Sequence, residues 1–110
     1  MNGNASIRAV IQEIVRRLVA EYAPQKIILF GSYAYGQPDE DSDIDLLIIK
    51  ATEERFPERL DTVRRAATGA HWRIPFEPIV LTPEEVAQRL KAGDQFVAEI
   101  LQKGKVLHAA

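Results

Sequence analysis

The stretch IILFGSYAYGQPDEDSDIDLLII, residues 27–49, places two apolar runs on either side of a polar segment. Each run is too short for a helix and is bounded by turn-forming or polar residues, so we predict buried strands over residues 26–30 and 44–49. For the segment between them we predict a short helical turn over residues 32–35 and then a polar loop over residues 36–42. Five acidic residues lie between positions 39 and 45, and we expect the first three to belong to a solvated loop.

The last two of these acids, Asp43 and Asp45, are separated by one residue at the start of the second strand. Because side chains two apart in a strand point to the same face, both carboxylates should project side by side. Two like charges this close repel each other, and a divalent cation between them removes the penalty. Mg²⁺ prefers a few carboxylates together with water and phosphate oxygens. The pair alone therefore indicates either a nucleotide-bound Mg²⁺ or a solvated acidic turn.

A possible phosphate contact precedes this acidic pair. Glycine at position 31 allows the backbone to approach a ligand closely, and Ser32 offers a hydroxyl at the start of a helical turn, where backbone N–H groups also favour phosphate. No P-loop lysine and no dinucleotide fingerprint follows. A phosphate contact at the end of one strand and an acidic pair at the start of the next are more specific together than either is alone.

Glu77 is the candidate for a third carboxylate, which two-metal phosphoryl transfer requires. It lies in a third predicted strand, residues 74–81, in phase with Ile79 and Leu81. The alternative is an edge-strand charge that prevents pairing with another chain. Pro75 and Pro78 also place this strand at an edge of the sheet or at a strand end, because proline has no N–H group to donate.

The remaining pattern predicts amphipathic helices over residues 6–22 and 57–70, a helix opened by Thr82 and ended by Gly93, a last helix between Asp94 and Gly104, and a short strand over residues 105–108. On the second helix, the three arginines at positions 59, 64 and 65 are expected to form a solvated face. The order of elements predicts one domain, residues 1–110, of the mixed α/β (α+β) class with a small mixed sheet flanked by helices.

Composition narrows the classes of function further. The 110 residues contain no cysteine, which excludes disulfides and thiolate metal sites, and the net charge of −2 argues against direct nucleic-acid binding. No apolar run is long enough to span a membrane, and the N-terminus has no apolar core of a signal peptide. We therefore expect a cytoplasmic protein without a membrane partner. Trp72 is expected to pack rather than to stack on a base.

Residues 29–49, LFGSYAYGQPDEDSDIDLLII, resemble the core of the DNA polymerase beta-type nucleotidyltransferases, in which Gly-Gly or Gly-Ser is followed by two acids spaced by one apolar residue. The short length and the motifs G-S-x-A-x-G and S-D-x-D-L resemble those of the minimal nucleotidyltransferases, the MNT type. The resemblance extends over IPFEPIVLTPEE, residues 74–85, and EILQKGKVLH, residues 99–108. It implies the polymerase beta-like fold.

The resemblance also implies a role for each matching residue. Gly31 and Ser32 would hold the triphosphate, Asp43 and Asp45 would ligate two Mg²⁺ ions, and Glu77 would complete one metal site. The reaction would be in-line attack on the α-phosphate of a nucleoside triphosphate, with ATP as the expected substrate. Many minimal members are antitoxins that form hetero-oligomers with a HEPN-domain ribonuclease toxin and silence it by transferring AMP to a tyrosine.

Two departures from the family pattern keep other functions open. Glu77 stands where aspartate is usual and is followed by Pro78, and Tyr35 stands where many relatives carry arginine. These residues favour a catalytically weakened antitoxin that neutralises its toxin by binding alone. A free-standing transferase acting on a small molecule, of the aminoglycoside type, is the third reading, although 110 residues leave little room for the helical domain that larger relatives use to clamp substrate.

Overall fold

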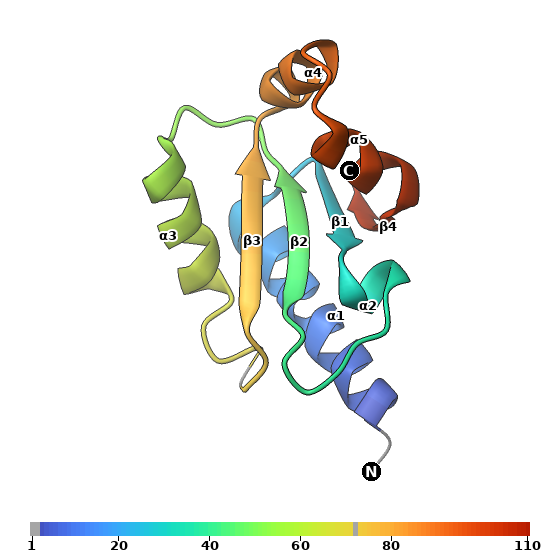
Figure 1. Cartoon of the computed structure of the whole chain (residues 1–110). Coiled ribbons are helices and arrows are strands. Elements are labelled where there is room, and N and C mark those ends of the chain that lie inside the picture. Colours follow the sequence, from blue (N-terminus) through green and yellow to red (C-terminus); the bar gives the residue numbers. More distant parts are fainter. Residues whose placement is uncertain (1–2, 72) are drawn as a thin grey trace.

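The computed structural model describes residues 3–71 and 73–110, so Trp72 lies outside the described residues. The helices are α1 (Gly3–Tyr22), α2 (Ser32–Tyr35), α3 (Phe56–Ala66), α4 (Pro83–Lys91) and α5 (Gln95–Lys103), and the strands are β1 (Lys26–Phe30), β2 (Ile44–Ile49), β3 (Phe76–Leu81) and β4 (Lys105–Ala109). In this part of the chain the strands form one sheet in the order β3-β2-β1-β4 (Figure 1). The predicted α/β class with a small mixed sheet flanked by helices is confirmed.

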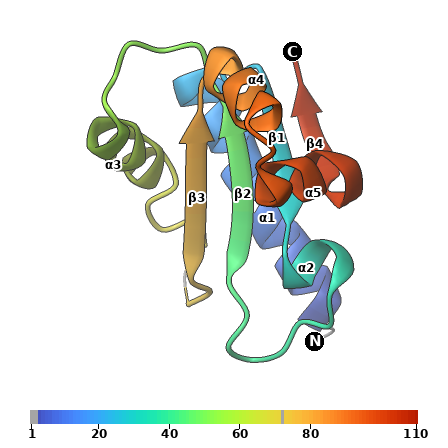
Figure 2. The same ribbon diagram turned by 45° about the horizontal axis from the view of Figure 1, so that its top comes forward.

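The sheet contains both antiparallel and parallel strand pairs. β1 pairs antiparallel with β2 and with β4, whereas β2 pairs parallel with β3. The parallel pair needs a crossover connection, and α3 lies in it (Figures 1 and 2). β3 is an edge strand, which is one of the two placements that its prolines allow.

Helices cover both faces of the sheet. On one face, β1 and β2 pack against α1 and α3 through a cluster that includes Ile14, Leu46 and Val63. On the other, Leu47 of β2 packs with α4 and α5, with Ile100 among its neighbours. A central strand buried on both sides must be apolar along nearly its whole length, which explains the sequence of β2. Asp45 is the exception, since it is the charged residue in this strand.

Some element boundaries differ from the predictions. α1 begins at Gly3, three residues earlier than expected, and β3 begins at Phe76, two residues later. α3 ends at Ala66 rather than at residue 70, because a turn follows in which Gly69 adopts a positive φ of 81°. None of the helices within residues 3–71 and 73–110 combines the length and apolar character needed to cross a membrane.

The prediction that Arg59 belongs to a solvated face is wrong. Its side chain is 7% exposed, and its guanidinium donates hydrogen bonds to the carbonyl oxygens of Glu54 and Val80, at 2.8 and 3.2 Å. It also donates to both carboxylate oxygens of Glu85, at 2.7 and 3.2 Å. Glu85 in turn forms the predicted capping box with Thr82. Arg59 therefore joins α3 to the end of β3 and to the start of α4.

Candidate active site

The turn after β1 brings the backbone directly against Asp45. Phe30, the last residue of β1, is paired with Asp45 of β2. The next residue, Gly31, has φ 74° and ψ −155°, a region of backbone conformation occupied almost only by glycine. A Cβ atom on Gly31 would overlap Oδ2 of Asp45 and lie 3.1 Å from its Cγ. Glycine is therefore required here both by backbone geometry and by the carboxylate beside it.

Ser32 begins the short helix α2 immediately after this turn. The N–H groups of Ala34 and Tyr35 donate to the carbonyl oxygen of Gly31, at 3.0 and 3.1 Å, which fixes the turn. Among the described residues, the hydroxyl of Ser32 has no hydrogen-bond partner. Since the first N–H groups of a helical turn also lack intrahelical acceptors, this position offers donors that a phosphate group could accept from.

The parallel pairing of β2 and β3 places Asp45 directly beside Glu77. Asp45 is in phase with Leu47, and Glu77 is in phase with Ile79 and Leu81, which pack toward α4 and α5, so both carboxylates lie on that face. Burial, together with the negative charges of Asp43 and Glu77, raises the pKa of Asp45 to about 6. All three predicted carboxylates are thus close enough to interact electrostatically, with Asp45 as the most deeply placed.

The carboxylates have the right chemistry for Mg²⁺, although they do not form a closed cage. Three oxygen donors of like charge meet beside a glycine with no side chain, and added positive charge would relieve their repulsion. Within the described residues, no group of three or more His, Cys, Asp or Glu side chains is compact enough to hold a metal ion. Mg²⁺ usually keeps several water or phosphate ligands and needs only one or two carboxylates. The residues present fit that open mode of binding.

Arg64, which the sequence assigned to a solvated face, approaches this group of acids. Its guanidinium lies 3.9 Å from the carboxylate of Glu77, and both side chains are more than half exposed. α3 packs on the opposite face of the sheet, so Arg64 reaches Glu77 around the free edge of β3. No spacing in the sequence could have indicated this contact, because it depends on how the crossover helix docks.

The loop before the acidic pair is held by hydrogen bonds within the loop itself. The carboxylate of Asp39 accepts hydrogen bonds from the N–H of Asp41 and the hydroxyl of Ser42, at 2.9 and 3.3 Å. The N–H of Asp39 donates back to the hydroxyl of Ser42, at 2.9 Å. These local contacts are typical of Asp and Ser in turns and could have been predicted from that signal. They fix the chain immediately before Asp43.

Comparison with known proteins agrees with this arrangement. The family model described as "Nucleotidyltransferase domain" matches residues 10–108. A Methanocaldococcus jannaschii protein named "Putative protein adenylyltransferase" is 54% identical over 100 residues, which cover 89% of this chain and 94% of the relative. The crystal structure of a "putative nucleotidyltransferase" from Sulfolobus solfataricus is similar with a TM-score of 0.60 and 25% identity, over 77% of this chain and 75% of that one.

The similarity to this nucleotidyltransferase structure agrees with the polymerase beta-like fold expected from the sequence. Together with the family match over most of its length, this shows that the chain belongs to the nucleotidyltransferase domain family.

Proposed function

We propose that the protein transfers a nucleoside monophosphate, AMP from ATP, to a hydroxyl group of a protein acceptor in the presence of Mg²⁺. One observation carries the proposal: Asp45 lies beside Glu77 in the parallel pair and against the bare backbone of Gly31. Enzymes of this family generally use a nucleoside triphosphate and a divalent metal. The 54% identity to a relative named "Putative protein adenylyltransferase" supports a protein acceptor.

In this proposal Asp43 and Asp45 would hold Mg²⁺ and Glu77 would complete the site, together with water and phosphate ligands. The metal would supply positive charge beside the triphosphate and would make the attacking hydroxyl easier to deprotonate. Gly31 leaves room for the phosphates to approach the strand end, and Ser32 donates its hydroxyl to one of them. The acceptor oxygen forms a bond to the α-phosphorus while the bond from that phosphorus to the bridging oxygen breaks. Pyrophosphate leaves with the bonding electrons.

We propose that Glu77 accepts the proton that the attacking hydroxyl group of the acceptor loses. It is the most exposed of the three carboxylates and lies on the edge strand, where an incoming macromolecule has access. The same exposure supports a large acceptor rather than an enclosed small molecule. In keeping with the resemblance to minimal nucleotidyltransferases, we propose that the protein acts as an antitoxin whose acceptor is a tyrosine of a HEPN-type ribonuclease toxin.

The test is to mix the protein with the product of the gene next to its own, as the candidate toxin, with Mg²⁺ and each nucleoside triphosphate in turn, and to measure intact masses. A gain of one or more AMP units on the toxin supports the proposal. Asp43→Asn should abolish the gain, whereas Asp41→Asn, in the adjacent loop, should leave it intact. Loss in both variants or in neither would contradict the assignment of the metal site. A gain on neither protein would contradict transfer to a protein.

A second function is favoured by the contact between Arg64 and Glu77. If Glu77 stays paired with arginine, the third metal ligand is lost and the protein would neutralise its toxin by binding alone. In that case the mass experiment shows no gain, while a tight complex forms and toxin activity falls. Replacing Asp43 with asparagine would then leave neutralisation unchanged. Modification of an added aminoglycoside in the same assay would instead indicate a small-molecule transferase.

A further inference from the structure

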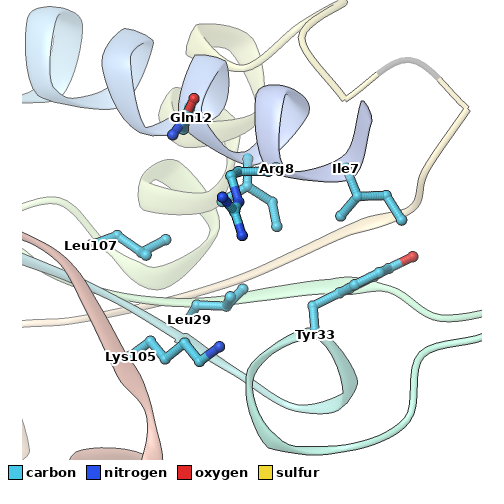
Figure 3. Close-up of a pocket in the computed structure, with 8 residues that line it drawn as sticks. Ile7, Arg8, Gln12, Leu29, Tyr33, Lys105 and Leu107 are labelled. Carbon is cyan, nitrogen blue, oxygen red and sulfur yellow. The ribbon is translucent and has the colours of Figure 1, made fainter. Parts of the chain in front are cut away.

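A cleft lies between α1 and the strands β1 and β4, apart from the three carboxylates. Its volume is about 340 Å³, which is near the lower end of the range for small-molecule sites. Figure 3 shows the side chains that line it. Leu29 belongs to the cluster that faces α1, whereas Asp45 lies on the face covered by α4 and α5. The cleft and the carboxylates are therefore on opposite faces of the sheet.

The lining of the cleft combines an apolar floor with two cations. Ile7, Ile11 and Leu29 supply apolar walls, with Leu107 from β4. Arg8 extends from α1 toward Leu29, and Lys105 extends toward the same space from β4 (Figure 3). Tyr33 of α2 closes one end. Such a cleft suits a ligand with an apolar body and an acidic group.

The two cations are not neutralised by the protein. Within the described part of the chain, the side chains of Arg8 and Lys105 take part in no ion pair or hydrogen bond. Residues 1, 2 and 72, which are not described, carry no carboxylate side chain. By contrast, Arg16 and Arg17 on the same helix are both paired with Glu13. Arg8 and Lys105 are thus left free to meet an external anion.

A bulge in β4 lies beside the cleft. Ile27 is paired with His108 and Ile28 with Val106, so Leu107 is an extra residue without a partner in β1. A bulge turns side chains that would alternate toward the same face, and bulges often occur beside binding sites. Lys105, which is paired with Leu29, and Leu107 are two residues apart in β4, so both face the cleft.

We propose that this cleft binds a small organic anion, in which an apolar or aromatic body lies on Leu29 and Leu107 and an acidic group meets Arg8 and Lys105. The site is independent of the transferase activity proposed above, since it uses none of the residues assigned to nucleotide or metal. A carboxylate and a phosphate would both satisfy the two cations. The shared chemistry is a single acidic group on an apolar body.

The experiment uses anilinonaphthalene sulfonate as the probe and the whole protein carrying ¹³C-labelled isoleucine and leucine methyl groups. On titration, the methyl signals of Ile7, Ile11, Leu29 and Leu107 should shift, while those of Leu47 and Ile100 on the other face should not. Benzoate and phenyl phosphate, added as competitors, distinguish a carboxylate from a phosphate ligand. Naphthol, which has no acidic group at neutral pH, should compete poorly.

Variants test the role of the charges. Arg8→Gln and Lys105→Gln should each weaken probe binding by about fivefold, and Arg8→Lys should restore most of the loss. Arg16→Gln and Lys103→Gln, which remove exposed cations nearby, are the matched controls and should bind as the parent does. Equal affinity in the parent and in the doubly substituted protein would overturn the proposal, as would shifts confined to Leu47 and Ile100.

Discussion

The substitution Gly31→Ala tests how the strand end is built against Asp45. The backbone conformation of Gly31 is one that residues with a Cβ adopt at a cost of about 1–3 kcal/mol. The new Cβ would also overlap Oδ2 of Asp45. Since that atom is the end of a side chain, it can rotate away, at a further cost of about 0.5–1.5 kcal/mol for leaving its preferred rotamer. We expect a total destabilisation of about 2–4 kcal/mol.

The two contributions can be separated by changing Asp45. In an Asp45→Ala background the overlapping oxygen is absent, so Gly31→Ala should cost only the backbone part, about 1 kcal/mol less than in the parent. In an Asp45→Asn background the side chain has the same shape, and the full cost should return. The free energy of unfolding, measured by urea denaturation and far-UV circular dichroism, gives each value.

Two outcomes would refute this reasoning. If Gly31→Ala costs the same in the parent and in the Asp45→Ala protein, the carboxylate does not lie against the glycine. If it costs less than about 1 kcal/mol in the parent, the turn does not need a glycine conformation. Either result would also remove the physical basis for placing phosphate at this strand end.

Three further changes probe the packing that supports the site. Arg59→Met should destabilise the protein by about 3 kcal/mol in thermal or urea unfolding, since it leaves a partly buried Glu85 unpaired. The control, Arg65→Met on the exposed face of the same helix, should change the stability by less than about 0.5 kcal/mol. The hydrogen bonds from Arg59 hold the pKa of Glu85 below its ordinary value, so the parent should lose this stabilisation as pH falls below about 4.5. Glu85→Gln should lack that part of the acid dependence of the melting temperature. Tyr22→Phe removes a 3.0 Å hydrogen bond to Glu54 and should cost about 1 kcal/mol; no loss of stability on urea unfolding would show that water replaces the bond.

The sequence predicted the strands at residues 26–30 and 44–49 and the last two helices well, because local signals bound them. Turn-forming Gly31 follows the first strand, and Thr82 with Glu85 forms the capping box that opens α4. Asp94 accepts a hydrogen bond from the N–H of Val97 and so caps α5 as expected. Where one or two residues decide a boundary, short-range chemistry is sufficient to predict it.

Contacts that depend on how distant elements dock were not predictable. The spacing of two residues in a strand predicted that Asp43 and Asp45 share a face. The pairing of Asp45 with Glu77 depends instead on the register between β2 and β3, which a long crossover connects. The burial of Arg59 and the approach of Arg64 to Glu77 depend on where α3 lies against the sheet. The same periodic pattern of charges is compatible with an exposed or a buried arginine.

The mixed pairing of the sheet has a consequence for the order in which the site can assemble. β1 and β2 are close in sequence, so their antiparallel pair, with Gly31 against Asp45, can form as soon as the first half of the chain has left the ribosome. Glu77 arrives only after α3 has been made and has docked, because a parallel partner must close a long loop. A nascent or truncated chain ending near residue 55 would therefore carry the acidic pair without its third carboxylate.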